Sequence, residues 1–556
     1  MKLKICLFLI LIFGFFLRFY NANWDANNHL HPDERFLTMV GTTTKIPSNL
    51  FDYFNPQKSS LNPLNNGYNF FVYGNLPLIV NKLLAVVSNN DNYNAYVIQG
   101  RNLSAIADFI CIFLVYQIVF LLERKYRLAK KTKVLAAFFY AISVLPIQLA
   151  HFFTVDPFLN LFMLLSFYQA LKFFYVKNKK SLVLSGVFFG LALACKITAV
   201  FILPLNLFFL LDWEKILVKK QLNLRKILLK TIFFFIFVYL AFRIGDPYKF
   251  VNNNWLDLRL NNTYIENLRT LKTYDNPDIW YPPGVQWINK PAIIFALKNL
   301  AFFGVGLGYF FLIVFGCFFI FRKKIFNLQI VFFWVLAFFL YQSTQFVKSM
   351  RYFIFIYPFL AIFAAIGLEK LLFLINKVKN IFVRYTLQVT SYTLILLWPL
   401  MFFSIYTQEH SRVVASNWMY KNISENAVIL SEYWDDALPI FFNPEKQFQL
   451  ESVPVFDPDT PEKWQKINQQ LRQADYYVLS SNRGWGSIMA VPKKYPLTSK
   501  FYRDLFANKT NYKLIKEFTS YPSLRWLGIP LDFPDQWSEE AFTVYDHPKV
   551  LIFKKK

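Results

Sequence analysis

Long apolar runs alternate with short basic segments along the first three quarters of the chain. A helix needs about 20 residues to cross a bilayer, and most of these runs approach that length. We expect eleven spans, with approximate limits 3–20, 101–122, 134–150, 156–176, 181–195, 197–211, 227–243, 299–321, 328–346, 352–372 and 385–403. The first run could be a signal peptide, but it lacks a small-residue cleavage site, which favours an uncleaved helix. The pattern predicts a polytopic α-helical membrane protein.

The basic segments between the runs set the expected orientation. They lie at 123–133, 177–180, 212–226, 322–324 and 377–384, and basic loops usually face the cytoplasm. This places outer loops at 21–100 and 245–295 and puts the end of the chain on the extracytoplasmic face. Within the first outer loop, residues 68–98 predict a short amphipathic helix lying in the membrane interface.

The pattern changes after about residue 403. Residues 460–473 have the start signals of a helix, a threonine cap followed by proline. Residues 427–432, 475–481 and 512–518 predict strands, as does the pair 542–545 and 549–553. We therefore expect a transmembrane domain over 1–403 and an extracytoplasmic α/β domain over 404–556.

Composition and charge narrow the class of protein. Of the 556 residues, 55% are hydrophobic and 17% charged, whereas a soluble protein is charged at about 25% of its positions. The net charge of +26 comes largely from loops between spans, which indicates topology and an anionic inner leaflet rather than nucleic-acid binding. The four cysteines lie in or beside apolar runs, so no disulfide framework or cysteine metal site is indicated.

Ionisable residues gather on the predicted outer face, where an ionisable group near the membrane often has a function. They are Asp33 and Glu34 in HLHPDERF (29–36), His151 and Asp156 in HFFTVD (151–156), Lys196 between the two short spans, Asp246 after the 227–243 span, and Lys348 and Arg351 in VKSMRYF (347–353). A purely structural role remains open for most of them. Asp33 and Glu34 could be a carboxylate pair solvated by water, and His151 could cap a helix end. Asp156 could be the N-cap before Pro157, and Lys348 and Arg351 could be snorkelling cations.

Together these carboxylates and cations suit the transfer of a sugar from a phosphate to an acceptor. An outward carboxylate can act as general base on an acceptor hydroxyl or amine. Arginine and lysine can hold a phosphate and stabilise its charge as it leaves a sugar. A phosphate attached to a lipid would explain why the site borders the bilayer.

Four motifs in order resemble the polyprenyl-phosphate-dependent glycosyltransferases of the GT-C fold. They are HPDE (31–34), HFFTVD (151–156), GLALACKITAVFILP (190–204) and KSMRYFIFIYPFLA (348–361). Within this fold the chain looks similar to the bacterial protein-mannosyltransferase-like group, which includes the aminoarabinose transferases of lipid A. The resemblance covers most of residues 1–403, and the C-terminal region is similar to outer domains of bacterial members.

The resemblance implies an inverting transfer of a hexosyl or pentosyl group from a polyprenyl-phosphate donor to a lipid, protein or glycan acceptor. Asp33 would be the base and Glu34 the neighbouring acid. Lys196, Lys348 and Arg351 would be candidates for the donor phosphate. His151, Asp156 and Tyr352 would shape the acceptor side or support the base.

A cofactor is not firmly implied. A divalent metal held by His29, His31 and His151 near the carboxylates is the alternative, as in some GT-C enzymes, although the histidine spacing fits no standard motif. Three rival functions remain. Oligosaccharide transfer from a lipid pyrophosphate would share the fold, a transporter would predict internal repeats and midplane charges, and a membrane scaffold would have no catalytic aspartate.

Overall fold

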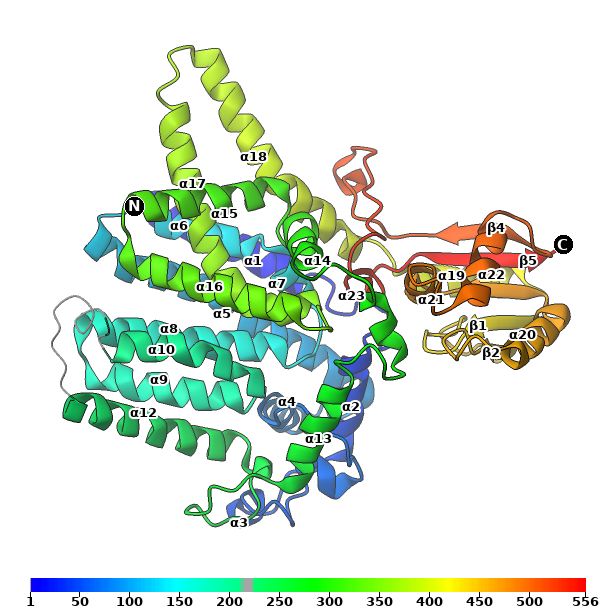
Figure 1. The fold of residues 1–556 in the computed structure, drawn as a ribbon, viewed down its shortest axis with the longest axis horizontal. Helices are drawn as coiled ribbons and strands as arrows, with labels where there is room; N and C mark the ends of the chain where they lie inside the picture. The colour runs from blue at the N-terminus through cyan, green and yellow to red at the C-terminus, as the bar shows by residue number, and fades with distance from the viewer. Residues whose placement is uncertain (1, 212, 214–223) are drawn as a thin grey trace.

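The apolar runs fold into a helical bundle, and a sheet domain projects from one side of it (Figure 1). The computed structural model describes residues 2–211, 213 and 224–556, so the predicted basic segment 212–226 lies almost entirely outside the described residues. The bundle consists of α1 (Lys2–Phe19), α5 (Tyr93–Tyr126), α6 (Thr132–Ala141), α7 (Val144–Ala150), α8 (Asp156–Val176), α9 (Lys179–Leu193), η2 (Ile197–Ile202), α10 (Leu203–Leu210), α12 (Leu224–Gly245), α14 (Ala292–Asn299), η5 (Leu300–Gly304), α15 (Leu307–Arg322), α16 (Phe326–Thr344), η6 (Met350–Ile356), α17 (Tyr357–Ile375) and α18 (Ile381–Phe403).

Every predicted span coincides with helix in the described part of the chain. Among the described residues, six helices are long and apolar enough to cross a membrane, or up to eight if two bent pairs each count as one span. The bent pairs are α6 with α7, at 53°, and Ala292–Gly304 with α15, at 116°. These helices agree with a multi-pass membrane protein, while the number eleven stays a prediction.

Glycines allow two of the helices to touch backbone to backbone. A Cβ atom on Gly316 of α15 would overlap the carbonyl oxygen of Phe363 in α17, and one on Gly367 of α17 would overlap that of Leu312 in α15. Apolar side chains gain little by meeting each other rather than lipid, so close backbone approach through small residues is a common way to pack membrane helices.

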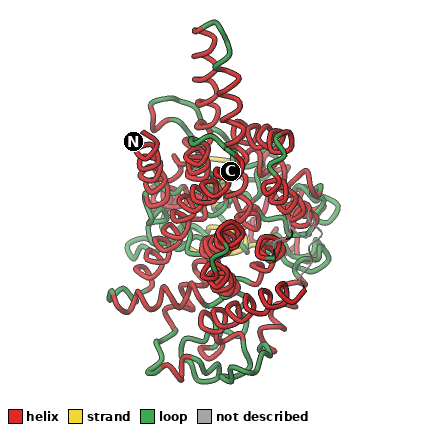
Figure 2. Tube along the Cα trace, turned by 90° about the vertical axis from the view of Figure 1, so that its left-hand side faces the viewer, coloured by secondary structure: helices red, strands yellow, loops and turns green. Residues whose placement is uncertain are grey.

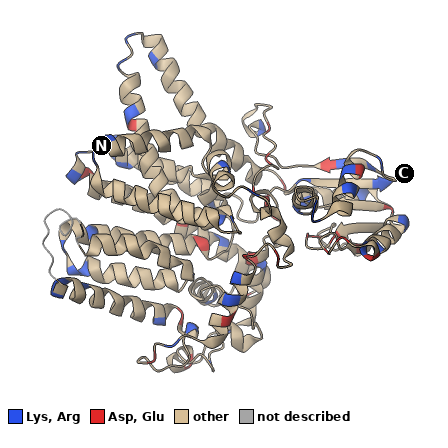
Figure 3. Cartoon of the chain, in the orientation of Figure 1, with Lys and Arg blue, Asp and Glu red and all other residues tan. Residues whose placement is uncertain are grey.

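Short helices fill the two predicted outer loops. The first loop holds α2 (Pro32–Thr43), α3 (Leu50–Tyr53), η1 (Pro63–Asn66) and α4 (Leu76–Val87), and the second holds η3 (Pro247–Lys249), α13 (Asn262–Thr273) and η4 (Pro282–Trp287). Helix α4 confirms a helix within 68–98. In both Figure 1 and Figure 2 the adjoining ends of α17 and α18 form a hairpin that projects away from the bundle. Figure 3 shows Lys and Arg at helix ends on the side of the bundle opposite the sheet domain.

The C-terminal region, residues 404–556, contains one mixed sheet of strand order β2-β1-β3-β5-β4. Strands β1 and β2 are parallel, as are β1 and β3, whereas β5 is antiparallel to both β3 and β4. The strands are β1 (Val428–Glu432), β2 (Gln449–Val453), β3 (Tyr476–Leu479), β4 (Tyr512–Phe518) and β5 (Val550–Lys555). The helical elements are η7 (Ser404–Thr407), α19 (Ser411–Asn422), α20 (Pro461–Gln473), α21 (Arg483–Ile488), α22 (Pro496–Phe506), η8 (Arg525–Leu527) and α23 (Glu540–Thr543).

The sequence predicted most of this region. Helix α20 starts as expected, because the Thr460 side chain accepts a hydrogen bond from the Lys463 backbone. Strands β1, β3, β4 and β5 match predicted strands, and β2 was missed. The predicted strand 542–545 is wrong, since α23 occupies its start. Phe542 packs its ring against Phe303 and Phe402 of the bundle instead of entering the sheet.

Candidate functional site

The stretch HLHPDERF begins helix α2, and its geometry separates the two carboxylates. His31 is the N-cap, and its Nδ1 accepts a hydrogen bond from the Glu34 backbone at 3.4 Å. Burial lowers the pKa of His31 to about 4, so the ring is neutral and can accept at this nitrogen. Asp33 and Glu34 follow in the first turn, where successive side chains point about 100° apart. The two acids therefore enter different surroundings.

Glu34 is completely buried in an ion-pair cluster. Arg101 of α5 donates to both of its oxygens, at 2.8 and 2.5 Å, and to both oxygens of Asp25, at 3.0 and 2.8 Å. The backbone N–H of Phe153 donates to Glu34 as well, at 2.8 Å. Because every Glu34 oxygen is engaged, this acid holds α2 against α5 and the 151–156 turn.

Asp33 faces a second basic residue and remains partly accessible. Its carboxylate pairs with Arg351 of η6, and the two side chains are 20% and 27% exposed. Tyr73 of the first predicted outer loop also hydrogen-bonds to it. Burial by itself would raise the pKa of Asp33, but the Arg351 charge and hydrogen bond outweigh it and lower the pKa to about 2. Asp33 is therefore ionised at neutral pH.

A second ion pair lies next to the first. Lys196 donates to Asp156 at 2.9 Å, and its Nζ lies 4.9 Å from the ring centre of Tyr352. The guanidinium of Arg351 lies 5.5 Å from the same ring. Asp156 is the first residue of α8, not its N-cap, which is Val155, so the N-cap interpretation is wrong. The structure thus brings Arg351 and Lys196 to the ring of Tyr352, and each cation carries its carboxylate partner, Asp33 or Asp156.

Besides Glu34, two more predicted site residues lie outside this group. Lys348 is nearly buried and donates to the carbonyl of Phe346 at 3.1 Å, and burial lowers its pKa while Asp275 opposes that shift. His151 ends α7, stacks on Tyr406 with ring centres 3.7 Å apart, and points its ring nitrogens at two backbone carbonyl oxygens.

The histidines do not form a metal site with the carboxylates. Among the described residues, no three His, Cys, Asp or Glu side chains come together as a set of metal ligands. The Nε2 of His29 lies 2.8 Å from the amide oxygen of Asn94, and the Nδ1 of His31 caps α2. The arrangement of these residues does not fit the metal-bound alternative.

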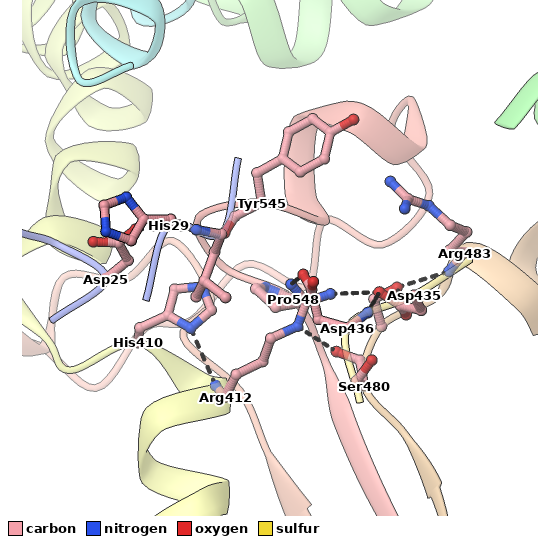
Figure 4. Close-up of polar contacts among 12 residues, drawn as sticks. Asp25, His29, His410, Arg412, Asp435, Asp436, Ser480, Arg483, Tyr545 and Pro548 are labelled. Atoms are coloured by element: carbon pink, nitrogen blue, oxygen red, sulfur yellow. Dashed lines mark hydrogen bonds and ion pairs between the residues drawn. The ribbon is translucent and has the colours of Figure 1, made fainter. Parts of the chain in front are cut away.

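The C-terminal region reaches the same stretch of α2. Arg35 pairs with Asp436 at 2.8 Å, and Arg412 binds Asp435 and Asp436 at 2.7 and 2.8 Å. Figure 4 shows Arg412, Asp435 and Asp436 near Tyr545. The ring of Tyr545 packs 4.4 Å from that of His31, two residues before Asp33. The sheet domain therefore lies directly beside the candidate base.

Several site residues escaped the sequence analysis. Tyr73, Arg101 and Tyr545 carry no motif of their own, and Tyr545 lay within a predicted strand. Arg101 offered the only usable signal, since an arginine at the start of an apolar run needs an anionic partner. The partner's position, 67 residues earlier in the chain, cannot be inferred from one sequence.

Comparison with known proteins supports the resemblance. The profile of the family dolichyl-phosphate-mannose-protein mannosyltransferase matches residues 95–241. A sequence search of curated proteins gives no match.

Solved structures of glycosyltransferases share the architecture. The structure of the oligosaccharyltransferase AglB from Archaeoglobus fulgidus, in complex with an inhibitory peptide and a dolichol-phosphate, is 12% identical and has a TM-score of 0.53; the alignment covers 100% of this chain and 88% of that one. Its complex with Zn and sulfate has 13% identity, a TM-score of 0.51 and coverage of 99% and 88%. ArnT from Cupriavidus metallidurans in the apo state has 12% identity, a TM-score of 0.47 and coverage of 88% and 94%.

The AglB similarity extends over the whole chain, including the C-terminal sheet region, whereas the family profile covers only α5 to α12. The likeness to the GT-C fold that the four motifs indicated is thereby confirmed. The chain is a GT-C-fold membrane protein that resembles, over residues 95–241, the dolichyl-phosphate-mannose-protein mannosyltransferases.

Proposed function

We propose that the chain is a membrane glycosyltransferase that moves a sugar from a polyprenyl-phosphate donor to an acceptor on the extracytoplasmic face. The observation that carries the proposal is the pairing of Asp33 with Arg351 beside Lys196. It puts an ionised carboxylate next to two cations at the end of the membrane helices. These are the groups that a transfer from a lipid-linked phosphate requires.

Asp33, rather than Glu34, is the general base in this proposal. Both carboxylate oxygens of Glu34 accept hydrogen bonds from Arg101, and one of them also accepts the backbone N–H of Phe153. Protonation of Glu34 would therefore break a buried charge cluster. Asp33 is partly accessible and has a partner that a substrate can replace. A base must come within hydrogen-bond reach of the proton it removes. Asp33 is accessible to an acceptor and Glu34 is not, so Asp33 is the base.

Arg351 and Lys196 bind the donor phosphate. An arginine can hold phosphate oxygens with two parallel hydrogen bonds, and a lysine adds a point charge. A phosphate at Arg351 competes with Asp33 for the guanidinium, so donor binding weakens the influence that lowers the pKa of Asp33. The donor therefore makes Asp33 a stronger base at the moment when one is needed.

The reaction then balances without a cofactor. The acceptor hydroxyl or amine gives its proton to Asp33 and attacks the anomeric carbon from the face opposite the phosphate, so the configuration inverts. The bond from that carbon to the phosphate oxygen breaks, and its electron pair leaves with the polyprenyl phosphate. Arg351 and Lys196 stabilise the charge that develops on this leaving group.

The remaining candidates have supporting roles. Asp156 orients Lys196 through their ion pair, and Tyr352 keeps both cations over its ring face. Lys348 donates to the Phe346 carbonyl and interacts electrostatically with Asp275, so we place it at the rim of the phosphate site. His151 supports the 151–156 turn through its stacking on Tyr406.

Transfer of an oligosaccharide from a lipid pyrophosphate is the second candidate function. The likeness to AglB over the entire chain favours it, because the matching region includes the C-terminal region, whose Tyr545 packs on His31 close to Asp33.

A donor panel tests both proposals. The purified protein is incubated with polyprenyl-phosphate sugars and lipid-pyrophosphate oligosaccharides, and the released polyprenyl phosphate or pyrophosphate is measured. We expect release from a monophosphate donor by the wild type and little release by Asp33→Asn. Release only from pyrophosphate donors supports the second function. No release from any donor, or equal release by Asp33→Asn, overturns the glycosyltransferase assignment.

A further inference from the structure

A carboxylate from the C-terminal region lies at the start of the helix that carries Arg351. The Oε2 atom of Glu539 accepts the backbone N–H of Met350 at 2.5 Å, across 189 residues of chain. Met350 is the first residue of η6, and the preceding N-cap residue, Ser349, makes no side-chain cap hydrogen bond. The first backbone N–H groups of a helix have no partner inside it. Glu539 therefore supplies the cap that the local sequence does not.

Glu539 is itself held firmly on several sides. Its side chain is almost completely buried, and its backbone N–H donates to Asn299 of α14 at 2.8 Å. The next residue, Glu540, accepts from Arg483 at 2.7 Å, and its backbone donates to Gln286 of the second outer loop at 3.2 Å. Contacts with the bundle, the second predicted outer loop and the C-terminal region thus fix the backbone from which the Glu539 side chain extends.

The cap acts one residue before the phosphate-binding arginine of the proposed function. Arg351 follows Met350 directly in η6, so fixing the Met350 backbone fixes where the Arg351 side chain begins. Asp33 approaches Arg351 from α2, and Glu539 approaches the same turn from the C-terminal region. Burial raises the pKa of Glu539 to about 7, against the lowering influence of the Met350 N–H, the Ser349 hydroxyl and Arg351. A neutral oxygen acceptor can therefore fill the same role.

We propose that Glu539 is a positioning residue for Arg351, through which the C-terminal region sets the geometry of the donor-phosphate site. This inference rests on the proposed role of Arg351 as a phosphate ligand. The C-terminal region would then contribute to donor binding by positioning Arg351. Removing the cap frees the first turn of η6 and lets Arg351 move away from the position that a phosphate needs.

Binding of undecaprenyl phosphate to the full-length protein in detergent tests the inference without requiring turnover. Affinity is measured for the wild type, Glu539→Ala, Glu539→Gln, Arg351→Ala and the double variant Arg351→Ala/Glu539→Ala. Loss of a helix cap corresponds to about a two- to thirtyfold change in an equilibrium constant, so we expect Glu539→Ala to bind about tenfold more weakly. Glu539→Gln keeps an acceptor oxygen and should stay within about threefold of the wild type.

The double variant separates positioning from general stability. If Glu539 acts through Arg351, its replacement has no further effect once Arg351 is alanine. Glu517→Ala is the matched control, since Glu517 lies on β4 in the same region and pairs with Lys549 at the surface. This control variant should bind undecaprenyl phosphate with the affinity of the wild type. If Glu539→Ala cannot be isolated folded, Glu539→Asp, whose shorter side chain does not reach Met350, replaces it with the same expectation.

The outcomes distinguish this inference from the proposed function. Wild-type affinity in Glu539→Ala, or independent losses that multiply in the double variant, overturns the positioning role while Arg351 remains a phosphate ligand. Absence of binding by the wild type, or unchanged binding by Arg351→Ala, overturns the phosphate site and the inference together.

Discussion

Asp33 and Arg351 form an ion pair across 318 residues of chain, joining the first predicted outer loop to the start of η6. Neither residue is completely buried, so both can exchange this contact for one with a substrate.

Replacing Asp33 by asparagine should abolish turnover but preserve donor binding. Loss of a general base costs about 10²- to 10⁴-fold in rate, and Asp33→Asn also frees Arg351 for the phosphate. We expect kcat to fall by that range and undecaprenyl phosphate to bind at least as tightly as in the wild type. Initial rates and direct titration measure the two quantities.

The matched control for that variant is Asp52→Asn. Asp52 lies in α3 of the same outer loop and contacts Asn49 at the surface, so this variant should leave kcat unchanged. A large loss of donor affinity in Asp33→Asn would contradict the competition between Asp33 and the phosphate for Arg351.

Replacing Glu34 by glutamine should damage stability. The change removes one charge from the buried cluster with Arg101 and Asp25, and breaking a buried pair on one side costs about 3–5 kcal/mol. We expect Glu34→Gln to lower the melting temperature in detergent clearly more than Asp33→Asn does. Equal melting temperatures for the two variants would show that Glu34 does not hold the loop.

Lys196 should contribute to donor affinity less strongly than Arg351. Hydrogen bonds to charged groups contribute about 1.5–3 kcal/mol, or about ten- to a hundredfold in affinity, and Lys196 can offer only a point charge. Lys196→Met should raise KM for the donor about tenfold, and Arg351→Ala should raise it further. An unchanged KM in Lys196→Met would remove this lysine from the phosphate site.

The C-terminal region should undock as the pH becomes alkaline. His547 lies between Asp546, at 2.5 Å, and Asp535, at 2.8 Å, and these charges raise its pKa to about 10 against the effect of burial. A histidine with a raised folded pKa contributes stability that is complete below about pH 6.5 and is lost as the pH rises through about 10. Asp546 also accepts hydrogen bonds from Gln148 of α7 in the bundle and from Tyr406 of η7.

Thermal unfolding measured from pH 6.5 to 10 checks this expectation. The wild type should lose melting temperature steadily over that range, whereas His547→Gln should start lower and change less. A parallel decline in the two proteins would show that other groups cause the alkaline loss.

The sequence alone predicted most secondary-structure elements and the class of protein, a helical membrane protein. Runs of apolar residues can hide their backbone polar groups from lipid only as helices, so each predicted span proved to be helical. Thr460 before Pro461 and the short β-rich runs likewise predicted α20 and four strands. These elements could be predicted because residues close together in the sequence determine them.

Only the tertiary structure decided what the ionisable residues do. Asp33 and Glu34 are neighbours of the same chemical type, and sequence offered no ground for their different surroundings. The turn of α2 directs one to Arg101 and the other to Arg351, and the packing of helices far apart in the chain brings those arginines there. The same packing brings Glu539 to Met350 and turns 542–545 away from the sheet. Such contacts join segments that lie from 67 to 318 residues apart in the chain, and no local pattern in a single sequence encodes them.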